Sequence, residues 1–287
     1  MSEALSKSNK LSVSLLCISA EVSRSGYYYW KEHCHEHIVR DSLSLDLLRT
    51  VHKRFHGKAG IRTIRMYLEF KYGIIMNTKK ICRLKRTYGI TTKIRRRNKY
   101  NTFNKAIHED ETSPNLLGRQ FRVETPDSVY STDITYLPYH GSRRAFLSAT
   151  KDLCSREIVH YNIGSSIVMS LASSGLESKV SSLSESVRSK LIMHSDQGSH
   201  YKDKTFRDIL NKYGISQSMS RKGNCLDNAP IESFFGHMKD EIDLKKCKSF
   251  DEVKAVVSEY IRYYNEERPQ WTLKKMTPAE YRRHLNS

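Results

Sequence analysis

The stretch VYSTDITYLPYHGSRRAFLSATKDLCSREIVHYNIG, residues 129–164, holds three runs that are rich in β-branched and aromatic residues. The runs span residues 129–137, 144–152 and 156–164. The turn-forming residues between them include Pro138, Gly141 and Ser155. Runs of this length and composition, bounded in this way, are typical of consecutive strands that pair with one another. The stretch therefore predicts an antiparallel meander of three strands.

Helix-like and strand-like patterns alternate after this meander. The helix-like segments are residues 166–183, 206–214 and 231–242, and the strand-like segments are residues 190–196 and 216–220. Three antiparallel strands followed by helix, strand, helix, strand and helix form the ribonuclease H-like plan. We therefore predict an α/β fold class: a ribonuclease H-like catalytic core, with a mixed five-stranded sheet and helices, in which the fourth strand lies beside the first.

Three carboxylates stand in this plan where they would converge. Asp133 lies in the first strand (YSTDITYL), Asp196 ends the fourth strand (LIMHSDQGSHY), and Glu232 begins the last helix (NAPIESFFGHMKDE). Each alone could be a surface carboxylate or a helix cap. Together they fit phosphodiester transfer, in which two cations about 3.5–4 Å apart stabilise the attacking and leaving oxygens. Oxygen ligands suit Mg²⁺, for which Mn²⁺ can substitute. We predict these three residues to be both catalytic and metal-binding.

Other polar residues near Glu232 are less decisive. Lys239 follows Glu232 by nearly two helical turns, so both side chains leave one edge of the helix. A contact to a DNA phosphate and a solvated lysine remain equally open from spacing alone. Asp152, and Asp227 or its neighbour Asn228, are expected to cap exposed backbone amides.

The charge of the chain points to a polyanionic partner. The formal net charge is +18, and residues 51–100 hold 16 lysines and arginines against the single acid Glu69. A charge run is often only a solvated face. Here apolar residues at helical spacing are interleaved with the basic ones, which favours nucleic-acid binding.

The same region reads as a helix-turn-helix. Helical patterns cover residues 41–55, 61–73 and 77–89, and Asn77 or Thr78 can cap the last of them. Two short helices joined by a tight turn, the second strongly basic, are typical of a motif that lays its second helix on DNA. The predicted DNA-binding residues there are Lys79, Lys80, Arg83, Lys85 and Arg86. A basic arm that follows phosphates is predicted to carry Lys93, Arg95, Arg96 and Arg97.

The first forty residues carry weaker signals. A short helix is expected over residues 13–22, and SRSGYYYW (residues 23–30) reads slightly better as a surface turn than as a second DNA-contacting helix. The cluster of His33, Cys34, His35 and His37 lacks the paired second half of a tetrahedral zinc site. Six scattered cysteines without CxxC pairs fit a reducing cytoplasm. No membrane-spanning or secretory segment is expected.

These patterns predict five parts of the chain. They are an N-terminal helical segment (1–40), a basic helix-turn-helix region (41–100), a linker (101–124), the catalytic core (125–245) and a C-terminal helical extension (246–287). Within the extension, Thr277 and Pro278 read as a capped helix start.

Several motifs together resemble one known family. They are SRSGYYYW, STDITY, HSDQGSHY, GNCLDNAPIESFFGHMKDE and YIRYYNEERPQWTLKKMTPAEYR. In these motifs the chain resembles the second-reading-frame catalytic product of insertion-sequence transposases of the IS-three family, whose DDE cores are related to retroviral integrases. The resemblance implies that Asp133, Asp196 and Glu232 are the metal-binding triad and that Lys239 is the basic position that follows the glutamate. It also implies, more weakly, that Gly198, Ser199, Asn228 and Ser233 lie beside the site.

The resemblance implies a DNA transposase, or integrase, that releases a 3′ hydroxyl with water and then uses it to join strands in copy-out-paste-in movement. The expected partners are double-stranded DNA of the element ends and target, and further copies of the chain on that DNA. The resemblance also implies an upstream-frame product with a helix-turn-helix and a leucine zipper as a fusion or partner. Residues 1–60 themselves show no sustained heptad repeat. The expected location is the bacterial cytoplasm, at the nucleoid and without a membrane partner. A hydrolytic nuclease of the same fold and a DNA-binding regulator with an inactive core are the alternatives.

Overall fold

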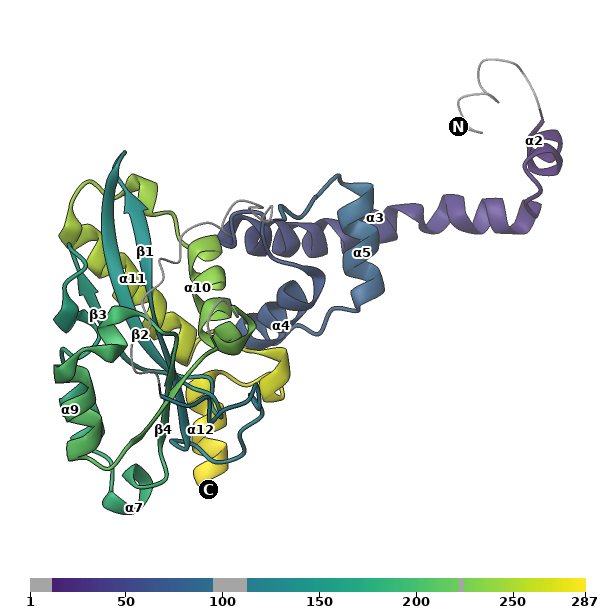
Figure 1. Ribbon diagram of the computed structural model, residues 1–287. Coiled ribbons are helices and arrows are strands. Elements are labelled where there is room, and N and C mark those ends of the chain that lie inside the picture. Colours follow the sequence, from purple (N-terminus) through teal and green to yellow (C-terminus); the bar gives the residue numbers. More distant parts are fainter. Residues whose placement is uncertain (1–11, 95–112, 222–224) are drawn as a thin grey trace. The chain divides into compact units, whose positions relative to one another are not determined.

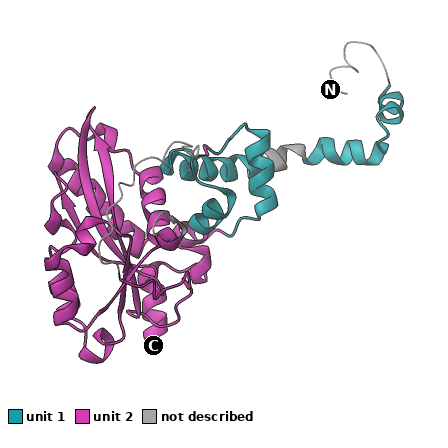
Figure 2. Ribbon diagram, in the orientation of Figure 1, with its two compact units in different colours: residues 1–68, 75–92 teal, residues 69–74, 93–287 magenta. Residues whose placement is uncertain are grey.

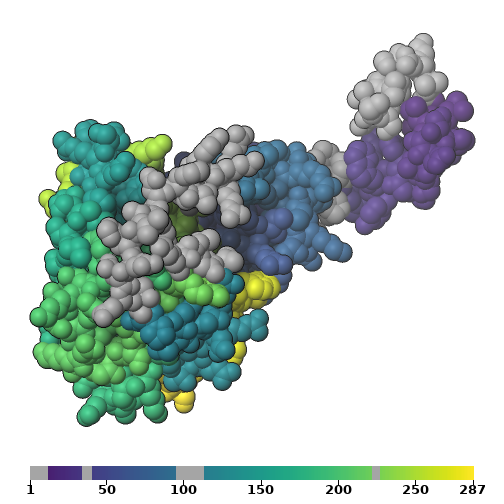
Figure 3. Space-filling model, in the orientation of Figure 1, coloured from purple at the N-terminus to yellow at the C-terminus, as the bar shows by residue number. Residues whose placement is uncertain are grey.

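The computed structural model describes residues 12–94, 113–221 and 225–287, with the side chains of residues 34–40 and 225–226 left out. The segments outside the described residues are grey in Figures 1 and 3. The chain divides into two compact units (Figure 2). The first comprises residues 1–68 and 75–92, and the second comprises residues 69–74 and 93–287.

The first unit is helical. Its helices are α2 (Val13–Ser19), α3 (Arg24–Arg54), α4 (Ile61–Tyr72), which ends in the second unit, and α5 (Thr78–Thr87). Side chains from α3, α4 and α5 form one buried cluster that includes Leu48, Ile64, Leu68, Ile81 and Leu84. The helix pair α4 and α5 predicted from the sequence is confirmed, and the Asn77 side chain caps α5 by accepting a hydrogen bond from the Lys79 amide over 2.8 Å.

The N-terminal prediction of a surface turn at residues 23–30 is wrong. Helix α3 begins at Arg24 and runs without a break to Arg54, so it includes SRSGYYYW and the helix expected from residue 41. Ser23 is its N-cap, and the Ser23 hydroxyl accepts a hydrogen bond from the Gly26 amide over 3.0 Å. This cap satisfies an amide that a helix start otherwise leaves without a partner, and it places the turn before Arg24.

The second unit is built on a five-stranded mixed sheet (Figure 1). The strands are β1 (Val129–Tyr139), β2 (Arg143–Asp152), β3 (Ile158–Gly164), β4 (Ile192–Ser195) and β5 (Ser216–Met219). Their order is β3-β2-β1-β4-β5. Strands β1, β2 and β3 pair antiparallel, whereas β4 pairs parallel with both β1 and β5. The predicted ribonuclease H-like topology is confirmed, including the fourth strand beside the first.

The two faces of β1 enter different cores because successive side chains of a strand point to opposite sides. Leu137 packs with α10 (Ala229–Glu241) and α11 (Phe250–Glu266) in one cluster. Tyr130 packs with α6 (Leu176–Ser181) and α9 (Lys204–Lys212) in the other. The sheet is therefore covered by helices on both faces.

The single helix expected over residues 166–183 is wrong. A 3₁₀ turn η1 (Met169–Leu171) is followed by the separate short helix α6. Gly175 lies between them with a φ of +75°, a left-handed conformation that interrupts an α-helix.

The remaining helical elements are short. Two of them, α7 (Glu185–Arg188) and α8 (Ser199–Lys202), are one-turn helices that the sequence patterns did not indicate. The 3₁₀ turns are η2 (Cys225–Asn228), η3 (Leu244–Lys246) and η4 (Trp271–Leu273). The last helix is α12 (Pro278–Asn286), where Thr277 and Glu280 form a capping box, which confirms the capped start expected there. None of the described helices is long and apolar enough to cross a membrane.

Both outer strands of the sheet have side-chain or backbone partners. On β3, the Asn265 amide group accepts a hydrogen bond from the Ile158 N–H over 2.9 Å and donates one to the Ile158 carbonyl over 3.0 Å. On β5, the Met219 N–H donates to the Pro114 carbonyl over 3.3 Å, and the Ser218 hydroxyl accepts from the Leu116 N–H over 3.0 Å. Residues 113–119, the segment that we call the strap, thus lie along β5.

Candidate active site

Strands β1 and β4 bring Asp133 and Asp196 to the same place in the sheet. The parallel register pairs Val129 with Ile192 and Ser131 with His194. Asp133 lies two residues further along β1, and Asp196 directly follows the end of β4, near enough for its charge to act on Asp133. Side chains two residues apart on a strand share a face, so the Asp133 carboxylate lies on the face that carries Ser131.

Helix α10 starts on this same face. The Asn228 side-chain oxygen accepts a hydrogen bond from the Ser131 hydroxyl over 2.6 Å, and the Asn228 amide nitrogen donates to the Thr132 carbonyl over 3.3 Å. From β2, the Lys151 ammonium donates to the Pro230 carbonyl over 3.0 Å. Asn228 and Lys151 are both buried. These contacts fix the first turn of the helix that carries Glu232.

A second contact fixes the direction of α10 along β1. The Lys239 ammonium donates to the Thr135 hydroxyl over 2.6 Å, so the helix and the strand run the same way from Asn228 and Ser131. A helix advances about 1.5 Å per residue and a strand about 3.3 Å. Glu232 therefore lies ~6 Å along the helix from Asn228, and Asp133 lies ~7 Å along the strand from Ser131. The Glu232 and Asp133 carboxylates therefore lie at about the same distance along α10 and β1.

The electrostatics of Asp133 agree with this geometry. Burial raises the pKa of the Asp133 carboxyl to about 7, and the nearby Asp196 and Glu232 carboxylates act in the same direction. The hydrogen bond that Asp133 accepts from the Ile134 N–H over 2.7 Å, and the Lys239 charge, oppose this increase in the pKa. Two like charges around one partly buried carboxylate are unfavourable until a cation joins the three.

The donor chemistry of the three residues fits a hard cation, although their side chains do not yet form a coordination shell. Across the part of the chain that the structure describes, no three His, Cys, Asp or Glu side chains are close enough together to hold one metal ion. One oxygen of Asp133 is held by the Ile134 amide, and one of Asp196 is held by the Gly198 amide over 2.8 Å. Each carboxylate keeps its second oxygen for another partner.

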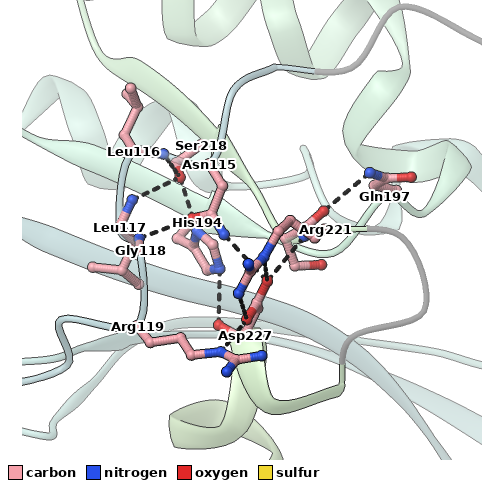
Figure 4. A network of polar contacts seen from close by, with 11 residues as sticks. Asn115, Leu116, Leu117, Gly118, Arg119, His194, Gln197, Ser218, Arg221 and Asp227 are labelled. Atoms are coloured by element: carbon pink, nitrogen blue, oxygen red, sulfur yellow. Dashed lines mark hydrogen bonds and ion pairs between the residues drawn. The ribbon is translucent and has the colours of Figure 1, made fainter.

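Asp227, one residue before Asn228, is the centre of a polar network (Figure 4). Its buried carboxylate accepts hydrogen bonds from the Arg119 guanidinium over 2.6 Å, from the Arg221 amide over 3.0 Å and from Asn115 over 3.2 Å. The Asp227 carbonyl lies 3.0 Å from Nε2 of His194, whose Nδ1 lies 2.9 Å from the Ser218 hydroxyl. The network joins the strap, β4, β5 and the start of α10.

The expected helix-capping role of Asp227 and Asn228 is wrong. Asn228 occupies the N-cap position of α10, but its side chain makes no capping hydrogen bond and bonds β1 instead. The Asp227 carboxylate binds two guanidinium groups, and the hydrogen bonds from Arg221 and then Arg119 hold its pKa well below the usual range. Asp152, in contrast, accepts the backbone amides of Cys154 and Ser155, as expected of a capping residue.

Sequence reasoning missed Arg119, Arg221 and Asn115 as partners of Asp227. Arg119 and Asn115 lie more than 100 positions before Asp227, in the segment expected to be a linker. No sequence periodicity relates residues so far apart. The only hint in the sequence was that Asp227, an acid in the loop before α10, had no basic residue beside it, so a cationic partner had to come from elsewhere in the chain.

The predicted DNA-binding residues lie mainly in the first unit. Lys79 and Arg86 are exposed on α5. Arg83 makes two hydrogen bonds to Asp41, of 2.7 and 2.8 Å, and the Lys85 ammonium donates to the Thr92 hydroxyl over 2.7 Å. Lys80 is half-buried and Lys93 is exposed. Arg95, Arg96 and Arg97 lie outside the described residues, as do the side chains of Cys34, His35 and His37.

Comparison with known proteins agrees with both units. Residues 123–225 and 213–278 match models of the integrase core domain, and residues 39–98 match an HTH-like domain. Transposase InsK of insertion sequence element IS150 from Escherichia coli (strain K12) is 34% identical over 268 residues, covering 92% of this chain and 91% of the relative. A 31 kDa protein of insertion element IS600 from Shigella sonnei is 33% identical, covering 93% and 97%.

A likeness to solved structures is more distant. The simian T-cell lymphotropic virus intasome, solved in complex with PP2A regulatory subunit B56 gamma, contains a chain that aligns with a TM-score of 0.47 and 14% identity. The alignment covers 82% of this chain and 74% of that one.

Proposed function

The chain belongs to the insertion-sequence transposases with an integrase core domain, and from this premise we propose that it cuts and joins DNA strands with Asp133, Asp196 and Glu232 as its metal-binding triad. The proposal is supported by the effect of the nearby Asp196 and Glu232 carboxylates on the pKa of Asp133, and by the contacts that anchor the start of α10 to β1. DNA transposition is the activity of the family.

Divalent cations, two Mg²⁺ ions or Mn²⁺ in their place, would be held by the three carboxylates and would supply charge stabilisation to the attacking and leaving oxygens. The part of the protein itself is to hold the three carboxylate residues in place. Asp133 is held by the Ile134 amide, Asp196 by the Gly198 amide, and Glu232 by the contacts of its helix to β1. These backbone contacts hold the residues near one another, and binding of the cations would draw the side chains into a common coordination shell.

Lys239 is proposed to hold a DNA phosphate beside the triad. Its ammonium is fixed by the Thr135 hydroxyl, two residues along β1 from Asp133, and its charge lowers the pKa of the Asp133 carboxyl. A cation at this distance can bind the phosphate chain that enters the site.

The first unit is proposed to grip duplex DNA through α5 and the basic arm that follows. The proposed contacts are Lys79, Lys80, Arg83, Lys85, Arg86, Lys93, Arg95, Arg96 and Arg97. Joining two element ends to a target is expected to require several copies of the chain, alone or with an upstream-frame product. Since the relatives belong to bacterial insertion sequences, the proposed setting is the cytoplasm, on nucleoid DNA.

The proposal is tested by strand transfer on oligonucleotides that carry the ends of the element encoding the chain, in Mg²⁺ and in EDTA. The wild-type chain should give metal-dependent cleavage and joined products, and Asp133→Asn, Asp196→Asn and Glu232→Gln should each lose both. Asp243→Asn, a surface carboxylate outside the site, is the matched control. Undiminished cleavage by any triad variant would refute the assignment of that residue.

A nuclease of the same fold remains the second candidate because it would use the same carboxylates. It predicts cleaved but never joined products in the same assay. The basic helix-turn-helix and its arm favour the transposase, since they offer a long grip on duplex DNA. A regulator with an inactive core predicts DNA binding without cleavage under every metal condition.

A further inference from the structure

An exposed tyrosine stands beside the proposed active site. Tyr136 lies on β1 three residues after Asp133, and 54% of its surface is exposed. Strand β4 pairs with β1 only over Val129–Ser131, so the edge of β1 beyond Asp133 has no neighbouring strand on that side among the described residues. Tyr136 is an odd number of residues from Asp133, so its side chain leaves the opposite face of β1. The ring nevertheless lies near the Lys239 ammonium, which is hydrogen-bonded to Thr135 on the Asp133 face, so the ring is reached around this edge of the strand.

Two cations flank this ring. The Arg144 guanidinium carbon, from β2, lies 5.7 Å from the centre of the Tyr136 ring, and the Lys239 ammonium, from α10, lies 4.9 Å from it. Arg144 is itself exposed, while Lys239 is fixed by its hydrogen bond to Thr135. Three different elements thus bring an aromatic face and two positive charges to one spot.

The stability of the fold explains neither the exposed Tyr136 ring nor the two cations beside it. A cation over an exposed aromatic ring contributes only about 0.5–1 kcal/mol, and an exposed tyrosine loses most of the hydrophobic gain that burial gives. The combination matches what single-stranded nucleic acid needs. Bases stack on aromatic rings, and cations on either side hold the phosphates.

The location also fits the reaction. Three residues of strand place Tyr136 about 10 Å along β1 from Asp133. One DNA strand advances 3.4 Å per nucleotide along its axis, so the ring is about three nucleotides or fewer from a phosphate held at the carboxylates. A base still stacked inside the duplex cannot offer its face to a tyrosine. The occupant must therefore be a base that has left its pair.

We propose that Tyr136, Arg144 and Lys239 form a binding site for an unpaired nucleotide within three positions of the scissile phosphate, with its base stacked on Tyr136 and its phosphates held by the two cations. The inference rests on the proposed function, because it takes the carboxylates as the place where the phosphate is cut. It adds that the chain opens the base pairs next to the cut and keeps one base open.

The first test detects the stacked base directly. Terminal duplexes of the encoding element carry 2-aminopurine at each of the three positions on either side of the cut, and the full chain is added in EDTA, so that no strand is cleaved. Because 2-aminopurine is already quenched by stacking inside a duplex, the bound complexes are compared with one another. At one position the DNA bound to Tyr136→Ala should fluoresce more than the DNA bound to wild type or to Tyr136→Phe, since the unpaired base has lost the ring that quenches it. Trp271→Ala, at another exposed aromatic side chain of the same unit, is the matched control. Equal quenching by Tyr136→Ala and wild type would overturn the proposal.

The second test couples protein and DNA changes. Tyr136→Ala and an abasic nucleotide at the quenched position should each weaken binding about tenfold, and the two together should weaken it no more than either alone. Independent effects that multiply to about a hundredfold would show that the base and the ring do not meet. Arg144→Ala should reduce the affinity for the duplex with an unpaired end more than the affinity for a longer duplex without an end.

The two proposals fail separately. Equal 2-aminopurine fluorescence with wild type and Tyr136→Ala at every position, together with metal-dependent cleavage by wild type, would overturn the nucleotide site and leave the triad standing. Cleavage that survives in Asp133→Asn would overturn the triad, whereas the quenching measured without metal would still report whether a base stacks on Tyr136. Because Tyr136 is half exposed, its replacement should leave the thermal unfolding midpoint unchanged, and a circular dichroism melt checks this.

Discussion

Asn228, the N-cap of α10, accepts a hydrogen bond from Ser131 over 2.6 Å and so joins the start of the helix to β1, two residues before Asp133. The bond sets how far along the strand Glu232 comes to lie. Replacing Asn228 with Ala should therefore displace Glu232 from Asp133.

Asn228→Ala should lower the rate of strand cleavage about a hundredfold, since a shift of about 1 Å in a catalytic group can cost that much. DNA affinity should stay within twofold of wild type, as the grip lies elsewhere. Single-turnover cleavage with a binding titration measures both quantities, and Asn211→Ala on the exposed side of α9 is the control. An equal loss of DNA affinity in Asn228→Ala would indicate a folding defect instead.

Divalent metal should stabilise the wild-type chain against heat. The three proposed carboxylates repel one another, and a bound cation offsets this repulsion, so a concentration one hundred times Kd should add about 2.7 kcal/mol to the free energy of unfolding. A thermal melt with and without Mn²⁺ measures the shift in Tm. Asp133→Asn should lose most of it and Asp243→Asn should keep it. The same shift in both variants would place the metal outside the triad.

Asp227 should stabilise the chain in a pH-dependent way. Its folded pKa is lowered by hydrogen bonds from Arg221 and Arg119, so its contribution is complete above the unfolded value of about 4 and is lost as the pH falls through the folded pKa. Asp227→Asn should lower the free energy of unfolding by about 2 kcal/mol at pH 7. This is less than the usual cost of breaking a buried ion pair, because the side chains of both arginines are partly exposed to water. Urea unfolding at pH 7 and pH 3.5 should show the difference shrinking at the lower pH.

A surface pair provides the comparison for Asp227. Lys212 lies 2.6 Å from Glu177, but both side chains are about half exposed. Glu177→Gln should lower the free energy of unfolding much less than Asp227→Asn does, because water screens an exposed ion pair. If Asp227→Asn and Glu177→Gln lower the free energy of unfolding equally, burial of Asp227 is not the source of its stabilising effect.

The buried pair of Arg268 and Glu241 should hold α11 to α10. The shortest distance between the two groups is 2.7 Å, and their side chains are only 12% and 11% exposed. Arg268→Ala should cost about 3 kcal/mol because it leaves the Glu241 charge buried without its partner. The double variant Arg268→Met with Glu241→Met should cost less than this single change, as measured by urea unfolding. A double variant that is less stable than Arg268→Ala would contradict the expected desolvation cost.

Contacts to DNA should differ along α5. Arg83 is already engaged by two hydrogen bonds to Asp41, whereas Lys79 and Arg86 are exposed. Lys79→Ala and Arg86→Ala should each reduce the slope of log K against log salt concentration by about 0.9, the amount for one phosphate contact. Arg83→Ala should change the slope less, and Lys254→Ala on α11 should not change it. Fluorescence anisotropy over a salt series measures the slopes, and a larger effect at Arg83 would show that DNA displaces Asp41.

The sequence predicted the sheet well because each strand carries its own local signal. The runs ending at Leu137, Asp152 and Gly164 alternate or stay apolar over the length of a strand and are separated by turn residues. Consecutive strands joined by such short turns can pair in only a few ways, so the order of the strands could be predicted. The amphipathic helices α4, α5 and α10 were predicted for the same reason. The domain limits and the roles of the triad stay predictions.

What the sequence did not predict depends on contacts between distant residues or on a single backbone angle. Asp227 was expected to cap a helix because its neighbours in sequence suggested it, whereas its partner Arg119 comes from the strap. The break before α6 depends on the left-handed conformation of Gly175, and glycine is also tolerated within helices. In α3 the Ser23 cap outweighed the turn signals that follow it.

Asn265 gives Ile158 the two hydrogen bonds that a neighbouring strand would otherwise give. An outer strand with open N–H and C=O groups is a template on which another chain can add a strand, and such addition leads to aggregation. Transposases that gather on one DNA molecule meet at high local concentration. The Asn265 side-chain amide therefore removes one attachment point for strand-to-strand growth at the start of β3.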